Sequence, residues 1–240
     1  LPNISNRLGH NIRTNNETLV SISSLDKDKN YSKGVAIGSI LDTDENSHLE
    51  VVRYSEGSNA WKLLHLPYVT GSTIFSRLAM VLVSFIKSPR NYFKIYLVNS
   101  WAKKTVTLLF MQSLDSTLRF KRTIFGLMSS SLSTGKKPTP FIKESIKLIN
   151  EYAKAVNGVS TSFALETIAG IPSTAHILGG AVMGENSAEG VIDKNNKVFG
   201  YKNLYIIDGA MISANPGVNP SLSITAIAER AMDQIPAKVN

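Results

Sequence analysis

The residue types and spacings best suited to chemistry lie in the last third of the sequence. His176 stands just before Leu178-Gly179-Gly180, and small residues there would let another backbone or a planar ring approach closely. A neutral imidazole can accept a proton near pH 7, which makes His176 a candidate general base. An isolated histidine is also commonly a structural residue with satisfied hydrogen bonds, and its neighbours alone do not separate these interpretations.

The tripeptide Asn219-Pro220-Ser221 marks the start of a helix that we expect to span residues 220–235. Proline suits the first helical position, where an N–H would have no partner, and asparagine is a favoured cap. The free N–H groups and the positive end of the helix dipole would then stabilise an anion placed before the helix. From these residues alone, Asn219 need be no more than a cap.

Two acidic residues fall in or next to expected strands. Residues 203–209 predict a buried strand that ends in the turn Asp208-Gly209, and forming this turn is the simplest role for Asp208. Residues 49–54 predict a second strand, which carries Glu50. A glutamate in an alternating strand usually faces solvent, so the pattern alone gives Glu50 no further role.

The other expected elements follow from periodicity and turn residues. Residues 1–33 are expected to be irregular, because polar residues cluster there with proline and glycine, and residues 129–140 predict a loop. A strand at 34–41 is expected to be buried and to be joined to the next by a turn at 42–48. The expected strands cover residues 34–41, 49–54, 106–111, 118–122 and 203–209.

The clearest helix is expected between Pro140 and Gly158. Thr139 can cap it, Pro140 suits its first turn, and Gly158 suits its end. Apolar residues at spacings of three and four give this helix one apolar face. They are Ile142, Ile146, Ile149, Ala153 and Val156.

The composition excludes several kinds of site. The 240 residues are 43% apolar and 18% charged, which is typical of a globular protein. The absence of Cys excludes disulfides, Cys-ligated zinc, iron–sulfur clusters and thiol catalysis within this chain. The four His residues are widely spaced without an HExxH-type pair, so no metal site is expected.

The sequence also indicates in which part of the cell the protein is expected. No apolar run approaches the ~20 residues of a spanning helix. The sequence begins at Leu1 with no secretion-signal pattern, so we expect a processed chain or part of a longer one. Because Cys is absent, we expect a cytoplasmic or peripheral membrane protein rather than a disulfide-bonded secreted one.

Residues 71–125 carry the whole excess positive charge of the chain. They hold nine basic residues and one acidic residue, which matches the net charge of +8. They are also rich in large apolar residues. This combination is typical of a surface that meets anionic lipid or a hydrophobic substrate, or of core elements whose polar sides are basic. Nucleic acid is not an expected partner, because no known recognition module is present.

Five short stretches with distinctive residues follow one another in the last third of the sequence. They are His176–Gly180, Gly190–Asp193, Asn203–Gly209, Gly217–Pro220 and Ile224–Arg230. This pattern resembles the C-terminal signature of the glucose–methanol–choline (GMC) family of flavin oxidoreductases, most closely its cholesterol-oxidase-like branch. A fainter resemblance covers Leu8-Gly9 and residues 13–17, which look like the stretch that follows the flavin-binding half in this family.

The resemblance implies roles for individual residues. His176 would lie over the flavin and take the O–H proton of an alcohol, while Asn219 would reach the same oxygen. Glu50 resembles the active-site carboxylate of cholesterol oxidases and would act as a catalytic or isomerising base, a role for which Glu56 is less suited because Gly57 suggests a turn. The residues expected to contact FAD are Asp208, Gly209, Gly217, Asn219, Pro220 and Ser221.

The resemblance also implies the fold class and its division. An α+β substrate-binding (cap) domain, with a mostly antiparallel sheet and helices, would occupy most of residues 1–170. Residues 171–240 would complete the active site and supply the last strand and helix of an α/β FAD-binding domain. The G-x-G-x-x-G motif that begins such a domain is absent, so this chain by itself is expected to be inactive.

The implied function is FAD-dependent oxidation of an alcohol, such as a sterol or another hydrophobic alcohol. The electron acceptor would be O₂ or, in a dehydrogenase of the same family, another carrier. A flavin-free module that binds lipid or sterol is the alternative from another class. Residues 71–125 are expected to form the cavity entrance and to contact a membrane peripherally.

Overall fold

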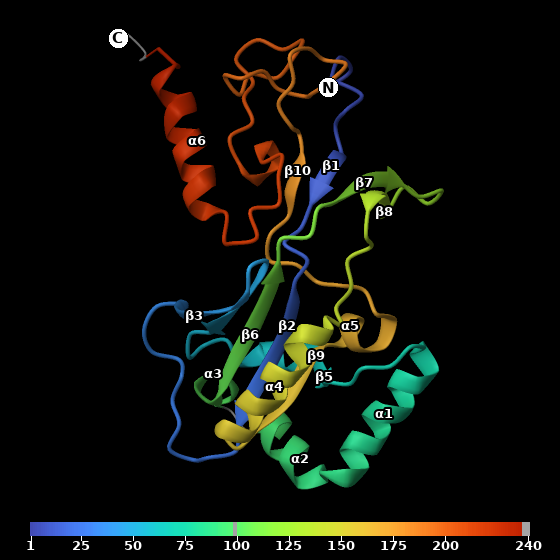
Figure 1. The fold of residues 1–240 in the computed structure, drawn as a ribbon, viewed down its shortest axis with the longest axis vertical. Coiled ribbons are helices and arrows are strands. Elements are labelled where there is room, and N and C mark those ends of the chain that lie inside the picture. The colour runs from blue at the N-terminus through green and yellow to red at the C-terminus, as the bar shows by residue number, and fades with distance from the viewer. Residues whose placement is uncertain (98–99, 237–240) are drawn as a thin grey trace. The chain divides into compact units, whose positions relative to one another are not determined.

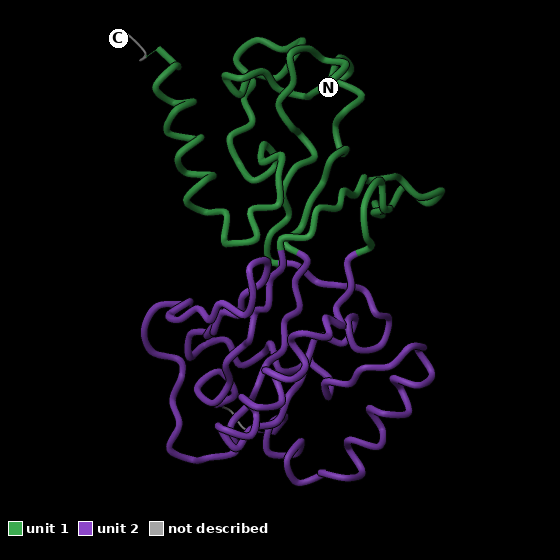
Figure 2. Tube along the Cα trace, viewed as in Figure 1, with its two compact units in different colours: residues 1–15, 113–137, 175–240 green, residues 16–112, 138–174 purple. Residues whose placement is uncertain are grey.

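A computed structural model describes residues 1–97 and 100–236 and divides the chain into two compact units. Unit 1 comprises residues 1–15, 113–137 and 175–240, and unit 2 comprises residues 16–112 and 138–174 (Figure 2). The chain therefore passes between the units four times. The division at residue 170 that the sequence suggested concerns domains of the family and stays a prediction.

Unit 2 is built on a six-stranded antiparallel sheet with the strand order β3-β4-β6-β2-β9-β5 (Figure 1). Its strands are β2 (Thr18–Ser24), β3 (Ile37–Asp44), β4 (Ser47–Arg53), β5 (His65–Pro67), β6 (Thr105–Gln112) and β9 (Gly158–Phe163). Both neighbours of β6 pair with it over most of its length. The mixed α and β composition with antiparallel sheets agrees with the fold class expected from the sequence.

Helix α4 (Lys143–Ala155) covers one face of this sheet. Val20 and Ile22 of β2 and Leu108 and Phe110 of β6 alternate toward it and pack with Ile149 in one buried cluster. Side chains two residues apart in a strand share a face, so the residues between them point to the opposite side. The sheet therefore has one apolar face and one face that carries hydroxyl and ionisable groups.

Unit 2 also contains helices other than α4. They are η1 (Asn59–Leu64), α1 (Ile74–Lys87), α2 (Pro89–Leu97), α3 (Trp101–Lys104) and α5 (Ala164–Ala169). Thr73 and Ser76 form a capping box that fixes the start of α1. Tyr92 and Ile95 of α2 pack with Trp101 and Ala102 of α3 in a second cluster, which also includes Val159 of β9.

Unit 1 contains a four-stranded sheet and the C-terminal helix. The strands, in the order β10-β1-β7-β8, are β10 (Leu178–Gly180), β1 (His10–Arg13), β7 (Ser116–Arg122) and β8 (Met128–Gly135). The turn η2 (Gly209–Met211) and helix α6 (Ser221–Asp233) follow. Leu178, Val191, Ile192 and Met211 form its core, with Ile224 of α6 packed against them.

The first 33 residues contain two strands, so the prediction that they are irregular is wrong. β1 pairs with β7 and β10, and β2 lies in the middle of the sheet of unit 2. The misleading feature is the serine content of β2. Ser21 and Ser23 occupy the polar face of the sheet, while Val20 and Ile22 occupy the apolar face.

A strand does occur near residues 34–41, but the prediction that it is buried is wrong. β3 is the edge strand of the sheet, and its Ile40 and Leu41 are 57% and 52% exposed. The turn between β3 and β4 is also shorter than residues 42–48, because β3 continues to Asp44 and β4 begins at Ser47. The predicted strands at 49–54, 106–111 and 118–122 are confirmed as β4, β6 and β7.

The loop predicted at residues 129–140 is wrong for its first half. Met128–Gly135 forms β8, whose hydroxyl-rich residues pair with β7, and only residues 136–140 are irregular. The helix predicted after Pro140 begins later, at Lys143, with Ile142 rather than Thr139 at the cap position. It ends at Ala155, and Asn157 with a φ of 46° makes the exit turn, while Gly158 already begins β9. Its apolar face is confirmed.

The buried strand predicted at residues 203–209 is also wrong. Asn203 has a φ of 58°, which interrupts an extended chain, and the segment contributes a single bridge between Tyr205 and Lys197. Asn203 and Asp208 are exposed. In the described ranges 1–97 and 100–236, no helix has the length and apolar character needed to cross a membrane.

Candidate functional site

His176 lies in unit 1, partly exposed and two residues before β10. The glycines that follow it are required by the backbone. Gly179 has a φ of 73°, and a Cβ atom there would lie 2.1 Å from the carbonyl oxygen of Asn11. The N–H of Gly9 donates to the carbonyl oxygen of Gly180 at 2.7 Å. The close approach inferred from the small residues is therefore to the β1 backbone.

Gly209 joins the segment that carries His176 to helix α6. A Cβ atom at Gly209 would lie 3.2 Å from the carbonyl oxygen of Ile177 and 3.6 Å from Cδ1 of Ile224. The residue after His176 and the first turn of α6 thus both lie against Gly209. Asp208 caps η2, because its Oδ1 accepts the N–H of Ala210 at 2.9 Å. The simple turn role considered for Asp208 is the one its contacts support.

The loop that leads to Asn219 is fixed by side-chain amides. The N–H of Gly217 donates to Oδ1 of Asn215 at 2.8 Å, and Nδ2 of Asn215 donates to the carbonyl oxygen of Leu114 at 3.0 Å. Nδ2 of Asn15 donates to the carbonyl oxygen of Val218 at 2.9 Å. Gly217 is buried with a φ of 66°, a conformation that favours glycine. The backbone just before Asn219 therefore has a defined path.

Helix α6 begins one position later than the sequence suggested. Pro220 occupies the cap position without a side-chain cap, so the prediction that Asn219 is the cap is wrong. The N–H of Ile224 donates to the carbonyl oxygen of Pro220 at 2.9 Å, and the N–H groups before it lie outside the ladder of the helix. Ser221 and Leu222 are exposed. This end of α6 can hold an anionic group, and Asn219 is the side chain next to it.

In unit 1, the residue after His176 and the helix after Asn219 thus both contact Gly209. The convergence of the two side chains themselves stays a prediction. In the part of the chain that the structure describes, no group of three or more His, Cys, Asp or Glu side chains is placed to hold a metal ion.

Glu50 lies in unit 2 on β4, and its side chain is buried, at 4% exposure. Its position in the strand does not face solvent, unlike most glutamates in alternating strands. His48 precedes it on the same face, 6% exposed, with Nε2 3.5 Å from Oε1 of Glu50. Glu50 pairs with Leu109 of β6. Thr107 precedes Leu109 by two residues in β6 and therefore lies on the same face. Glu50 is therefore a carboxylate on a largely desolvated surface.

A buried network of hydroxyl groups and one imidazole lies on the same face of the sheet. Ser21 Oγ is 2.8 Å from Thr107 Oγ1 and 3.2 Å from Nε2 of His65. Nδ1 of His65 is 2.8 Å from the carbonyl oxygen of Trp61. Burial lowers the pKa of His65, so its ring is neutral near pH 7. The network orders the polar face and keeps His65 in a fixed orientation.

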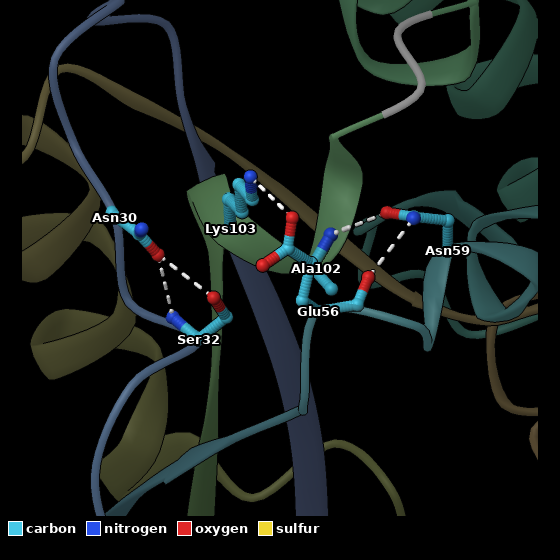
Figure 3. A network of polar contacts seen from close by, with 6 residues as sticks. All are labelled: Asn30, Ser32, Glu56, Asn59, Ala102 and Lys103. Atoms are coloured by element: carbon cyan, nitrogen blue, oxygen red, sulfur yellow. Dashed lines mark hydrogen bonds and ion pairs between the residues drawn. The ribbon is translucent and has the colours of Figure 1, made fainter.

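Helix α3 is held in place by polar contacts from the segment around η1 (Figure 3). Oδ1 of Asn59 accepts the N–H of Ala102 at 3.0 Å, and Nδ2 of Asn59 donates to the carbonyl oxygen of Glu56 at 3.0 Å. The Glu56 carboxylate forms an ion pair with Lys103. Figure 3 shows the contacts of Asn59 with Ala102 and Glu56, and the contact of Glu56 with Lys103. Glu56 is thus an exposed structural partner of α3.

A cavity of about 300 Å³ adjoins α3. Its walls are mostly apolar, and its lining includes Trp101 and Ile95 together with Lys27, Lys94 and Lys104. Nζ of Lys104 donates to the carbonyl oxygen of Asp26 at 2.9 Å, so this lysine also fixes the loop after β2.

Several ionisable residues of unit 2 were missed by the sequence analysis. His48, His65, Glu17 and Glu166 are all buried. Glu166 is in α5, and its carboxylate accepts the backbone N–H of Ser173, seven residues later in the chain. The sequence feature that could have indicated His48 is its position two residues before Glu50, next to an expected strand. No comparable pattern marks Glu17 and Glu166, because they meet through tertiary packing.

Comparison with known proteins assigns residues 131–228 to a family model described as GMC oxidoreductase. The chain is 40% identical over 241 residues to a cholesterol oxidase of Acinetobacter baumannii, a match that covers 99% of this chain and 43% of that protein. It is 39% identical over 248 residues to a cholesterol oxidase of Mycobacterium tuberculosis (strain CDC 1551 / Oshkosh), again with 99% and 43% covered.

A third relative is named for a different activity. A 2-methyl-1,2-propanediol dehydrogenase of Mycolicibacterium austroafricanum is 32% identical over 90 residues, which are 38% of this chain and 16% of that protein. The chain thus spans less than half the length of the curated relatives that it matches.

Proposed function

Because this chain belongs to the GMC oxidoreductase family, we propose that the complete protein oxidises an alcohol with FAD, and that the alcohol is a sterol or another hydrophobic alcohol. By the complete protein we mean these residues together with any that precede or follow them in the native polypeptide. The observation that carries the proposal is the junction at Gly209, against which Ile177 and Ile224 both pack. His176 and Asn219 are next to the two segments that meet there.

In this proposal His176 and Asn219 act on the oxygen of the alcohol. A neutral imidazole of His176 accepts the hydroxyl proton, and the side-chain amide of Asn219 donates to the same oxygen. The fixed path of the loop before Asn219 supports this role, since Asn15 and Asn215 hold its backbone. Precise placement matters because a misplacement of about 1 Å can cost about 100-fold in rate.

The residues expected to contact FAD fit such a group. The first turn of α6 presents N–H groups outside its own ladder, next to exposed Ser221 and buried Gly217. The positive end of the helix dipole favours negative charge on a ring placed there. Asp208 and Gly209 would lie along the same cofactor, with the Gly209 backbone as the nearer group. When bound, the flavin accepts the hydride that leaves the alcohol carbon.

Glu50 and His48 are proposed to serve a second proton transfer. Oxidation of a sterol alcohol makes a ketone, and the carbon next to it becomes acidic enough for a carboxylate to remove a proton. The carboxylic acid formed in this way then returns the proton to a different carbon of the substrate, so that the ketone is isomerised with no net loss of protons. Glu50 is buried and next to an imidazole, which supports such a base. The cholesterol oxidases among the relatives support a sterol as the substrate.

The electron acceptor is proposed to be O₂, with a dehydrogenase as the alternative that one relative supports. A flavin-free protein that binds lipid is the alternative from another class. The absorbance of the purified complete protein separates these classes, because a bound flavin is yellow. Oxygen uptake against dye reduction, measured with the same alcohol, then separates an oxidase from a dehydrogenase.

Residues 71–125 are proposed to form a membrane contact and the entrance for the substrate. In α1 the burial is inverted, since Arg77 is 5% exposed while Phe75, Leu82 and Ile86 are 84%, 61% and 68% exposed. No acidic residue occurs between residues 71 and 97, whereas Lys87, Arg90 and Lys94 add positive charge. Apolar residues flanked by cations are suited to an anionic lipid surface.

The direct test of the proposed function compares alcohols of different size. We expect the complete protein to oxidise a sterol dispersed in detergent, and His176→Ala to retain flavin but lose turnover. An enzyme that oxidises only short polar alcohols would contradict the hydrophobic substrate. A complete protein that purifies without flavin and cannot be loaded with FAD would contradict the proposed function as a whole.

A further inference from the structure

Two glutamates are buried together in unit 2, and neither has a role in the function proposed above. Glu166 lies in α5 and is 1% exposed, and Glu17 lies just before β2 and is 2% exposed. They are close enough that the charge on Glu17 disfavours ionisation of Glu166 and raises its pKa. Buried carboxylates are uncommon unless they have defined partners. Their partners therefore indicate what the pair does.

Each carboxylate holds one of two consecutive residues. The N–H of Ser173 donates to Oε1 of Glu166 at 2.9 Å, and the Ser173 hydroxyl also hydrogen-bonds this carboxylate. The hydroxyl of Thr174 donates to Oε1 of Glu17 at 3.0 Å. Ser173 and Thr174 are otherwise in a segment without regular secondary structure. The two glutamates thus replace the strand or helix contacts that this segment lacks.

The segment fixed in this way leads directly to His176. Ala175 and His176 follow Thr174 in the chain. Two residues span at most about 7 Å, so a displaced Thr174 displaces the start of the path to His176. Further along, β10 fixes the chain again from Leu178. The chain that leads to His176 therefore starts from residues that the two glutamates hold.

The other ionisable groups on the packed elements do not neutralise Glu166. Arg77 of α1 donates to the carbonyl oxygens of Ile168 and Gly71, and its guanidinium lies over the Phe141 ring. His65 of β5 contacts Ser21 and Trp61. Tyr68, after β5, has a pKa raised to about 12 by burial and by the charge of Glu166, so it is neutral. Burial is the largest cause that raises the pKa of Glu166 to about 7, and the negative charge of Glu17 raises it further.

We propose that Glu17 and Glu166 are positioning residues for His176, which hold Ser173 and Thr174 in the one backbone path that presents the imidazole to the alcohol. The proposal rests on the proposed function, since it assigns His176 the role of base. Below about pH 7 a proton on Glu166 keeps the arrangement stable. When that proton is lost, two buried negative charges repel each other and the segment loosens.

The pH dependence of turnover gives a signature with a definite sign. Loss of the Glu166 proton lowers kcat at pH values above about 7, because the path to His176 loosens. The native profile is therefore expected to fall above about pH 7. Glu166→Gln removes this fall, since the amide can still accept the Ser173 N–H but does not ionise.

The experiment uses the complete protein loaded with FAD. We compare the native protein with Glu166→Gln, Glu166→Ala, Glu17→Ala and a control, Glu151→Gln, in which an exposed carboxylate of α4 is replaced. Each alanine variant is expected to lower kcat by about tenfold to 100-fold with KM little changed, because the base is misplaced while the binding surface remains. Glu151→Gln is expected to match the native protein at every pH.

Hydrogen exchange supplies a readout that does not depend on turnover. Backbone amides of residues 173–178 are expected to exchange faster in Glu166→Ala and Glu17→Ala than in the native protein or in Glu151→Gln. Native exchange over these residues, or native kcat in Glu166→Ala at all pH values, would overturn the proposal. If Glu166→Ala does not fold, a falling limb above pH 7 that persists in Glu166→Gln would overturn it.

The two proposals fail in different ways. A native protein that holds FAD but oxidises no alcohol contradicts the proposed function, and exchange over residues 173–178 still tests whether the glutamates hold the segment. An active native protein with an inactive His176→Ala variant and a fully active Glu166→Ala variant contradicts only the positioning role.

Discussion

His48 and Glu50 lie on the same face of β4, with Nε2 of the imidazole 3.5 Å from Oε1 of the carboxylate and both side chains nearly excluded from solvent. A buried carboxylate is costly when ionised unless a cation or hydrogen bonds accompany it. The imidazole of His48 is the polar side chain next to this carboxylate on β4. The pair places a proton-accepting group on a largely desolvated face of the sheet, which supports the proposed role of Glu50 as a base.

Replacing Glu50 by Gln tests its role as a base. In the complete protein we expect Glu50→Gln to lower the rate of the base-dependent step by about 100-fold to 10,000-fold, because a general base contributes about that much. The side chain keeps its volume, so binding of FAD and the melting temperature should change little. The measurement follows the ketone and any isomerised product separately by chromatography after single turnover.

Glu56→Gln is the matched control for this prediction. Glu56 follows the same strand by a few residues, but its side chain is 64% exposed and pairs with Lys103. Exposed ion pairs contribute about 0–1 kcal/mol, so this variant should retain native turnover. Equal losses in the two variants would indicate a general disturbance of the strand, and unchanged product formation in Glu50→Gln would remove Glu50 from the mechanism.

The raised pKa of Glu166 predicts how stability changes with pH. Burial first, and the charge of Glu17 in addition, raise the pKa from 4.5 to about 7. Between these values the folded state holds a proton that the unfolded state has lost, so this group makes stability fall as pH rises from about 4.5 through about 7. Glu166→Gln should be more stable than the native protein above pH 7, by on the order of 3 kcal/mol.

Thermal melts at pH 5 and pH 8 check this sign. The gain from Glu166→Gln should be small at the lower pH and large at the higher one, whereas Glu151→Gln should show no such trend. A gain of equal size at both pH values would show that Glu166 does not titrate between them.

The sequence predicted the elements whose apolar pattern is continuous or periodic, and it failed where polar residues serve a tertiary role. β6 and the apolar face of α4 followed directly from their residues. β2 was missed because Ser21 and Ser23 suggest a loop, although they bond Thr107 and Thr105 across the polar face. β3 was expected to be buried because Ile40 and Leu41 are apolar, but an edge strand leaves them exposed.

The candidate site shows the same limit. His176, Asn219 and Gly209 were accessible from the sequence, since they stand in a recognisable series of short motifs. The actual cap of α6 at Pro220 was not, because a one-residue shift at a helix end depends on its surroundings. Glu17 and Glu166 are separated by about 150 residues, and no local pattern can predict that two such carboxylates share one buried place.

The close approach at Gly179 predicts a large loss of stability on substitution. In Gly179→Ala the new Cβ atom would lie 2.1 Å from the Asn11 carbonyl oxygen, so β10 and β1 would have to separate. Gly126→Ala is the matched control, because Gly126 has a similar φ of 76° but nothing within 4 Å of the added atom. The difference in melting temperature between the two variants isolates the clash from the cost of the positive φ.

We expect Gly179→Ala to melt several degrees below Gly126→Ala and to hold FAD less tightly, since β10 begins two residues after His176. Equal melting temperatures would mean that the strands do not approach as closely as this geometry requires.

The cationic, apolar helices α1 and α2 predict binding to anionic membranes. The triple variant Lys87→Glu, Arg90→Glu, Lys94→Glu should bind vesicles of phosphatidylserine and phosphatidylcholine far more weakly than the native protein, because each basic residue near the surface contributes about 1 kcal/mol. Lys147→Glu, an exposed reversal on α4, is the control. Co-sedimentation at two salt concentrations measures the effect.

Native binding that is equal for anionic and neutral vesicles, or that does not weaken at high salt, would contradict an electrostatic contact. Binding that survives the triple variant but is lost in Phe75→Ser would instead assign the contact to the apolar side chains of α1, of which Phe75 is the most exposed.

The central claim, that His176 is the base that takes the proton of an alcohol, is tested most directly by the rate of flavin reduction in His176→Ala. The complete protein is loaded with FAD, mixed anaerobically with a sterol, and followed by the loss of flavin absorbance. We predict that reduction is slower by about 100-fold to 10,000-fold while the amount of bound FAD is unchanged. Reduction at the native rate, or loss of FAD from the variant, would contradict this account of His176.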